Sequence, residues 1–185
     1  MNSFCHRDCR CQFGEDWEDV SFVLPDLAVG GMVHADEIPA LRALGITHVL
    51  NVNWPDRPEY PEVVSAFRHL DLAILDDGQP KPPEWFRAGI AFADTMGPRD
   101  KLLVHCGHGV NRSPAMAYAI LRARGYAFAE RMIRDARPQT GSGATGSAFA
   151  VYRISADIAI DGNHLSRERI AIAGELTDAL ITWNE

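Results

Sequence analysis

The sequence has few of the features that mark membrane, secreted or nucleic-acid-binding proteins. No apolar run approaches the roughly 20 residues that span a bilayer, and no apolar signal segment opens the chain. Basic residues are outnumbered, 18 against 25 acidic, giving a net charge of −7. An acidic chain does not indicate a binder of nucleic acids or membranes, although a local basic site is compatible with it. We therefore expect a cytoplasmic protein without a membrane partner.

Cysteines are also few. Three of the four, Cys5, Cys9 and Cys11, crowd the first eleven residues, and Cys106 stands alone. Disulfide-stapled secreted domains have cysteines in even numbers spread along the chain, so this pattern does not indicate one. A lone cysteine in an intracellular chain is either a small buried hydrophobic residue or a nucleophile, and the residues around it distinguish the two.

The 185 residues suit one domain with short extensions. We expect a polar, Cys-rich tail at 1–20, a catalytic domain at 21–160 and a helical extension at 161–185. Alternating strand and helix patterns predict an α/β fold with a mostly parallel sheet of four to five strands and helices on both faces. The expected strands are 22–29 (an edge strand or hairpin), 46–52, 70–75 and 101–105. The expected helices are 34–44, 63–67, 84–96, 113–124, 127–136, 149–160 and 167–183.

Cys106 directly follows an expected strand, at the sheet edge where such folds bind ligands. A glycine-broken loop comes next, and Ser113-Pro114 opens a helix. In such a loop successive backbone N–H groups can turn inward around an anion, and the helix N-terminus adds partial positive charge. The segment therefore predicts a phosphate site formed by Gly107, His108, Gly109, Val110, Asn111 and Arg112.

The same segment carries a candidate nucleophile. The Arg112 guanidinium is a planar fork that can grip two phosphate oxygens at once. The positive field around the loop favours the Cys106 thiolate, which would attack phosphorus and form a phospho-cysteine. His105 would orient the loop and favour the thiolate, and Ser113 would donate a hydrogen bond to the sulfur when it leaves. This chemistry needs no cofactor and no metal.

The string His-Cys-x-x-Gly-x-x-Arg-Ser at 105–113 resembles the signature of the cysteine-dependent protein tyrosine phosphatase superfamily. Leu27-Ala-Val-Gly-Gly31, the run from Leu44 to Val52, and Arg137-Pro138 resemble segments of its dual-specificity branch. The resemblance covers roughly 22–155. It implies a phosphatase acting on phosphoproteins or phosphopeptides, at phosphotyrosine and also at phosphoserine or phosphothreonine.

Breaking a phosphate ester also requires an acid that protonates the leaving oxygen. Asp56 lies in Trp54-Pro55-Asp56, which spells the acid-loop motif of large tyrosine-specific phosphatases, but it lies 50 residues before Cys106. In the families that this chain resembles, the acid loop lies roughly thirty residues before the nucleophilic cysteine, as Asp76 and Asp77 do here. Asp77 is preferred because Asp-Gly-Gln-Pro resembles the acid loop of several dual-specificity members. The spacing to Trp85 favours Asp76 instead.

Two other functions use the same loop. His-Gly-x-Asn-Arg at 108–112 also resembles the RNA 5′-triphosphatase branch, where His108 would contact a second phosphate and Asn111 would brace the loop. A non-enzymatic phosphate-binding adaptor is the third hypothesis. Phosphoinositide-directed relatives usually carry extra basic residues in the loop, and this one has none before Arg112.

The N-terminal group Cys5, His6, Cys9 and Cys11 has the residue types of a zinc site. Structural zinc sites usually take ligand pairs from separated segments, whereas these four lie within seven residues. We expect surface cysteines on a loose tail and no metal. The oligomeric state is not indicated by the sequence.

Overall fold

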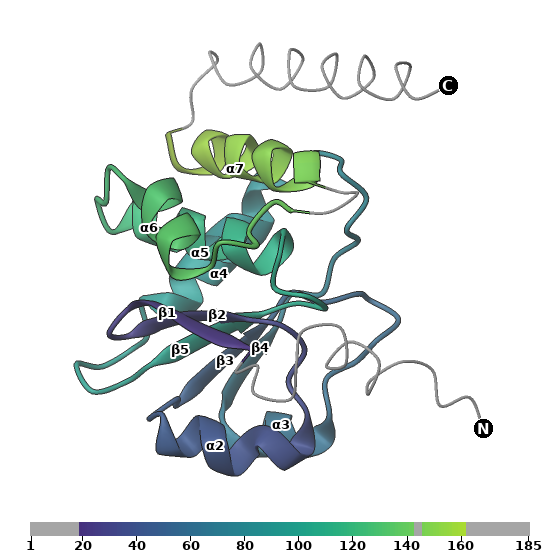
Figure 1. Cartoon of the computed structure of the whole chain (residues 1–185), viewed down its shortest axis with the longest axis vertical. Coiled ribbons are helices and arrows are strands. Elements are labelled where there is room, and N and C mark those ends of the chain that lie inside the picture. Colours follow the sequence, from purple (N-terminus) through teal and green to yellow (C-terminus); the bar gives the residue numbers. More distant parts are fainter. Residues whose placement is uncertain (1–18, 143–145, 162–185) are drawn as a thin grey trace.

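The computed structural model describes residues 19–142 and 146–161. Its centre is a five-stranded sheet in the order β1-β2-β5-β3-β4 (Figure 1). β1 and β2 form an antiparallel hairpin, and the other neighbouring strands are parallel. The strands are β1 (Val20–Leu24), β2 (Leu27–Gly30), β3 (His48–Asn51), β4 (Arg68–Asp71) and β5 (Leu102–His105). The predicted α/β class with a mostly parallel sheet is confirmed.

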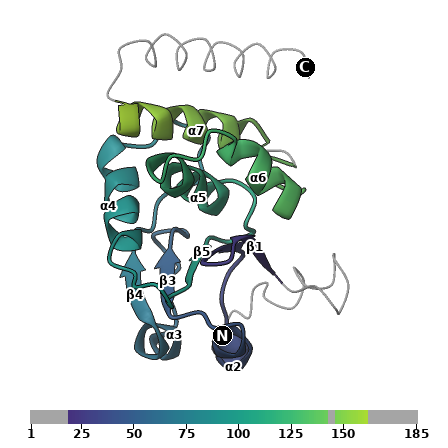
Figure 2. The same ribbon diagram turned by 90° about the vertical axis from the view of Figure 1, so that its left-hand side faces the viewer.

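Helices cover both faces of the sheet (Figure 2). Alternate side chains of one strand supply the two cores: Leu102 and Val104 of β5 face one cluster, and Leu103 faces the other. One face packs on α2 (Ile38–Ala43) and α3 (Pro61–Ala66). The other packs on α4 (Pro83–Ala93), α5 (Arg112–Ala123), α6 (Ala129–Ala136) and α7 (Gly146–Asp161). α5 is buried along nearly its whole length between the sheet and α7.

Several element boundaries differ by a few residues from the sequence expectation; α4, for example, ends at Ala93 rather than at residue 96. The helix expected at 34–44 begins as a 3-10 turn, Ala35–Glu37, and becomes α2 only at Ile38. Pro39 explains this difference, because in a continuous α-helix its ring would clash with the carbonyl group of residue 35. β4 ends at Asp71, short of the expected strand end at residue 75.

The chain beyond Asp71 nevertheless continues alongside the end of β3. Leu72 N–H donates to the Asn51 carbonyl and Ile74 N–H to the Asn53 carbonyl, each at 2.8 Å. This extension carries the Asp76-Asp77 segment to the carboxyl edge of the sheet, where β5 ends.

The described part of the chain contains no helix that is long and apolar enough to cross a membrane. The expected helix at 167–183, the Cys-rich tail and the zinc-like group Cys5, His6, Cys9 and Cys11 lie outside the described residues. The proposed division at residues 20 and 160 therefore stays a prediction.

Candidate active site

Cys106 directly follows β5 and is the first residue of the loop that leads into α5, which we call the phosphate-binding loop after its predicted role (residues 106–112). Its side chain is buried, and it is a free thiol. Two donors reach the sulfur at 3.3 Å: the backbone N–H of Gly109 and the hydroxyl of Ser113. The Ser113 hydroxyl also lies 3.0 Å from the Gly30 carbonyl, and its one proton serves one acceptor at a time. Ser113 is thus placed for the role expected of it.

The loop conformation depends on Gly109. This residue has φ = 65°, in the left-handed region that favours glycine. A Cβ here would also lie 2.1 Å from the Arg137 guanidinium. Gly107 does not have a positive φ, but its Cβ position faces Asn53 Oδ1 at 3.3 Å. Both glycines therefore permit close approach, and Gly109 also permits the turn.

Arg112 is almost completely buried at the first residue of α5. One of its terminal nitrogens donates to the Ile74 carbonyl at 2.9 Å, and its Nε lies 3.4 Å from Asp76 Oδ2. The guanidinium stacks 4.6 Å from the centre of the Trp54 ring. These contacts hold the fork beside the loop before any phosphate is bound.

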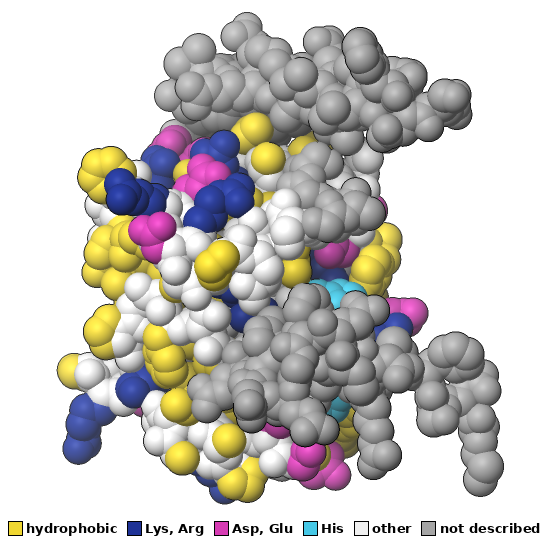
Figure 3. All heavy atoms as spheres, viewed as in Figure 1, with side chains coloured by type: hydrophobic (Ala, Val, Ile, Leu, Met, Phe, Trp, Pro, Cys, Tyr) yellow, Lys and Arg dark blue, Asp and Glu magenta, His cyan; other side chains and the backbone are white. Residues whose placement is uncertain are grey.

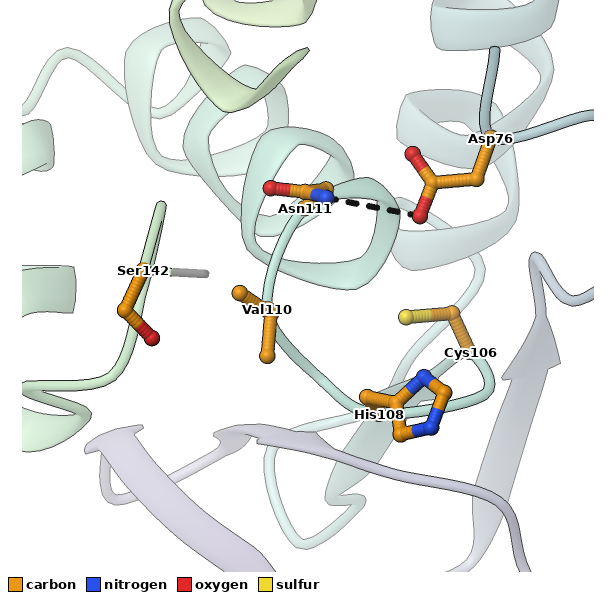
Figure 4. A pocket seen from close by; sticks show the side chains of 6 residues that line it. All are labelled: Asp76, Cys106, His108, Val110, Asn111 and Ser142. Atoms are coloured by element: carbon orange, nitrogen blue, oxygen red, sulfur yellow. Dashed lines mark hydrogen bonds between the residues drawn. The ribbon is translucent and has the colours of Figure 1, made fainter. Parts of the chain in front are cut away.

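A cavity of about 140 Å³ opens beside the sulfur. Figure 4 shows Cys106 Sγ and the Asp76 carboxylate pointing into it from different segments. The remaining lining residues are His108, Val110, Asn111 and Ser142. The volume is below the ~300 Å³ typical of sites for drug-sized ligands, so it suits a small anionic group better than a whole cofactor.

Asp76 and Asp77 occupy different places. Asp76 accepts a hydrogen bond from Asn111 at 3.4 Å within the cavity. Asp77 is not among the lining residues; its carboxylate is 41% exposed and pairs with Lys81. Burial raises the pKa of Asp77, but the hydrogen bonds from Lys81 and the Gln79 N–H outweigh it and lower the pKa overall. The structure thus brings Asp76, rather than the preferred Asp77, to the sulfur.

Two of the predicted phosphate ligands, His108 and Asn111, differ in their exposure. His108 is exposed at the rim, whereas Asn111 is buried and joins the loop to Asp76. His105 is the last residue of β5 and does not line the cavity. It is buried, with its Nε2 2.5 Å from the carboxylate of Glu59, so this contact holds the residue directly before Cys106.

Three supporting residues lie outside the set of site residues predicted from the sequence. Arg137 is buried and donates to the Gly109 carbonyl at 2.6 Å and the His108 carbonyl at 3.2 Å, and its guanidinium is 2.5 Å from Asp19. Trp54 of the Trp-Pro-Asp string stacks on Arg112, whereas Asp56 of the same string is exposed. Glu59 had no local signal at all. In the sequence, Arg137-Pro138 stands out only as a segment that resembles the dual-specificity branch.

No group of three or more metal-binding side chains is found within residues 19–142 and 146–161. The phosphate-binding loop instead offers backbone N–H groups and one guanidinium, which are the groups that bind an anion directly. Such groups can hold a phosphate ester, a thiolate at Cys106 can attack its phosphorus, and a carboxylic acid can protonate the leaving oxygen.

Comparison with known proteins agrees with this geometry. Residues 21–164 match the family model described as "PTP-SAK: Swiss Army Knife protein, DSP-PTPase phosphatase domain". Human dual specificity protein phosphatase 2 is 33% identical over 100 residues, which cover 54% of this chain and 31% of that protein. Dual specificity protein phosphatase 1-B of Xenopus laevis is 34% identical over 104 residues, covering 54% and 26%. The match thus spans about a third or less of the length of these relatives.

Solved structures share the fold. The crystal structure of human DUSP28 has a TM-score of 0.59 at 25% identity, with 74% of this chain and 94% of that chain covered. A mouse putative dual specificity phosphatase complexed with zinc tungstate has a TM-score of 0.60 at 22% identity, covering 78% and 92%. The family model covers most of the chain, and the chain belongs to the DSP-PTPase phosphatase domains of the dual-specificity branch of the protein tyrosine phosphatase superfamily.

Proposed function

We propose that this chain is a cysteine-dependent phosphatase that hydrolyses phosphate monoesters on proteins, at phosphotyrosine and also at phosphoserine or phosphothreonine. The observation that carries the proposal is the meeting of Cys106 Sγ and the Asp76 carboxylate in one cavity, with Arg112 beside it. A nucleophile, an acid and a phosphate-binding fork are then within reach of one phosphoryl group. The dual-specificity relatives support the choice of protein substrates.

The reaction runs in two steps. The Cys106 thiolate attacks phosphorus, the bond from phosphorus to the leaving oxygen breaks, and the acid gives that oxygen a proton. A phospho-cysteine remains, its oxygens held by the loop N–H groups and Arg112. Water then attacks phosphorus, the acid's carboxylate takes a proton from it, and the S–P bond breaks. The Ser113 hydroxyl, 3.3 Å from the sulfur, stabilises the departing thiolate.

We assign the acid to Asp76, with Asp77 as the alternative from the sequence. Asp76 lines the cavity, whereas Asp77 is paired with Lys81 outside it. Asp76→Asn should lower kcat/KM for an aryl phosphate about 100-fold, as expected for loss of a general acid, and Asp77→Asn should change it less than about threefold. The reverse order would return the assignment to Asp77.

The test of the function is hydrolysis of an aryl phosphate by the full chain. Cys106→Ser should abolish turnover while leaving the fold intact, because a serine hydroxyl at this position is a far weaker nucleophile than a thiolate. Arg112→Lys should impair turnover strongly, because a lysine cannot grip two oxygens. Full activity of the Cys106→Ser variant would contradict the proposal. Phosphopeptide binding without turnover by the unmutated chain would support the adaptor instead.

RNA 5′-triphosphate is the second candidate substrate, and exposed His108 at the cavity is the observation that favours it. The coloured part of the face in Figure 3 shows Lys and Arg side chains interleaved with Asp and Glu over α6, not one continuous basic surface. A phosphopeptide panel run beside triphosphate-ended RNA separates the two. Release of the γ-phosphate with little activity on phosphopeptides would select RNA.

The proposal also includes a cytoplasmic location. A thiol nucleophile works only while it is reduced, and the cytoplasm keeps thiols reduced.

A further inference from the structure

Tyr152 of α7 reaches the acid loop (residues 76–81) across 76 positions of sequence. Its hydroxyl lies 2.9 Å from Asp76 Oδ1 and 2.9 Å from the Gly78 backbone nitrogen. The Tyr152 side chain is completely buried in the cluster that α7 shares with α4 and α5. One phenol therefore bridges two residues of the loop that carries the proposed acid.

The direction of both hydrogen bonds follows from the partners. The Gly78 N–H can only donate, so it occupies the acceptor side of the Tyr152 oxygen. The hydroxyl proton is then left for the Asp76 carboxylate. Burial, together with the neighbouring Asp76 charge, raises the pKa of Tyr152, so the hydroxyl keeps its proton at neutral pH.

α7 also holds the far end of the acid loop. The Lys81 N–H donates to Ser155 Oγ at 3.2 Å, and Lys81 Nζ lies 4.6 Å from the centre of the Tyr152 ring. The Lys81 ammonium pairs in addition with Asp77. Lys81 is buried, so these contacts tie the end of the loop to α7 independently of the phosphate-binding loop.

The two carboxylate oxygens of Asp76 have different partners. Oδ2 faces Arg112 Nε and Asn111 Nδ2, both at 3.4 Å, while Oδ1 is bound by Tyr152. A bound phosphate would compete for Arg112, and the contact on Oδ2 would then be given up. The Tyr152 contact on Oδ1 does not depend on the phosphate site, so it would persist.

We propose that Tyr152 is a positioning residue for the reaction: its hydroxyl anchors Oδ1 of Asp76 and leaves Oδ2 facing the leaving oxygen of the substrate. This inference rests on the proposed function, with Asp76 as acid. Tyr152 touches neither the substrate nor the sulfur. It acts through Asp76, and losing it should impair proton donation rather than phosphate binding.

The experiment compares kcat/KM across aryl phosphates whose leaving phenols differ in basicity, using the full chain. Proton donation matters most for a basic leaving group, so a displaced acid steepens the dependence of rate on leaving-group basicity. Tyr152→Phe should lower kcat/KM about tenfold for phenyl phosphate and less than about threefold for 4-nitrophenyl phosphate. Asp76→Asn should steepen the dependence further.

Tyr118→Phe is the matched control. Tyr118 is likewise buried, and its hydroxyl donates to a carboxylate, that of Asp157, at 2.8 Å, but it does not line the cavity. It should leave the leaving-group dependence unchanged. In an Asp76→Asn background, Tyr152→Phe should have no further effect, since the hydroxyl acts through that carboxylate.

The outcomes separate this inference from the proposed function. An inactive unmutated chain would overturn the proposed function, whereas an Asp76→Asn variant with unchanged leaving-group dependence would overturn only Asp76 as the acid, and the role of Tyr152 with it. A steeper dependence in Asp76→Asn but not in Tyr152→Phe would overturn only the role of Tyr152. Equal losses on every substrate, in Tyr152→Phe as in Tyr118→Phe, would show a structural effect and would also overturn it.

Discussion

Glu59 is a buried carboxylate behind the nucleophile, between β3 and α3. Its Oε2 lies 2.5 Å from His105 Nε2 and 3.8 Å from His69 Nε2. Burial alone would raise its pKa, but the contacts with His105 and His69 outweigh burial and lower the pKa of Glu59 to about 2. The residue directly before Cys106 is therefore held by an ionised partner at neutral pH.

Replacing Glu59 should change stability in a pH-dependent way. A carboxylate whose pKa is lower in the folded state than in the unfolded state stabilises the fold at pH values above its unfolded-state pKa, here 4.5. This stabilisation is lost as the pH falls towards the folded-state pKa of about 2. Glu59→Gln should lower the free energy of unfolding by about 3 kcal/mol at pH 7, and the difference should shrink between pH 4.5 and 2. Urea unfolding across this range measures it.

Glu62→Gln is the control, because Glu62 is exposed at the start of α3. It should change the free energy of unfolding by no more than about 0.5 kcal/mol. A Glu59→Gln deficit that stayed constant down to pH 2 would contradict an origin in the ionised carboxylate.

At the scale of elements, the phosphate-binding loop is supported from behind by the segment after α6. Arg137 follows α6 directly, and its guanidinium donates to the carbonyls of Gly109 and His108. The Gly141 N–H donates to the Val110 carbonyl at 2.9 Å. These bonds give three carbonyls of the loop partners in the segment after α6, and so help to hold the loop in its conformation.

Gly109→Ala should disturb this arrangement on two counts. The left-handed φ of 65° strains an alanine, and the added Cβ would lie 2.1 Å from the buried Arg137 guanidinium. We expect a loss of about 2 to 4 kcal/mol in stability and a fall in kcat/KM of at least tenfold. Thermal unfolding and aryl phosphate turnover measure the two effects.

Gly125→Ala provides the comparison. Gly125 follows α5 with φ = 87°, but a Cβ there would meet no atom within 4 Å. This variant should cost about 1 kcal/mol and leave kcat/KM unchanged. Equal behaviour of the two variants would show that backbone strain alone, without the Arg137 contact, explains the Gly109 effect.

At the scale of the whole molecule, opposite edges of one site come from distant parts of the chain. The loop after β5 supplies the sulfur, the start of α5 supplies the guanidinium and the extension of β4 supplies Asp76. α7 holds the loop that carries Asp76. In the proposed reaction, Arg112 and backbone N–H groups would supply the positive charge that meets the phosphate, and this chemistry calls for no metal ion.

Turnover by the full chain should therefore survive metal removal. Dialysis against EDTA should leave kcat/KM for an aryl phosphate within about twofold of the untreated value, and vanadate should inhibit, because it occupies the site of a transferring phosphoryl group. Loss of activity on chelation that a divalent cation restores would contradict this expectation.

The sequence also determined much of the architecture. Apolar β-branched runs and glycine stops predicted the α/β class, an edge strand or hairpin at 22–29 and most helices, because these signals are local. The structure shows that 22–29 forms the hairpin. The early end of β4 and the 3-10 start before α2 were missed. Such boundaries depend on pairing partners and on single prolines more than on hydrophobic pattern.

For the site, the sequence by itself determined the stretch from His105 to Ser113, because its residues are contiguous and one strand, one loop and one helix start fix their geometry. Its motif favoured Asp77, whereas the structure places Asp76 in the cavity. Packing against the phosphate-binding loop and α7 orients Asp76, and neither contact can be read from adjacent residues of the sequence. The contacts of Trp54, Glu59, Arg137 and Tyr152 were likewise decided by the tertiary structure alone. Each joins partners many residues apart, and a contact of that kind leaves no periodic or local trace in a single sequence.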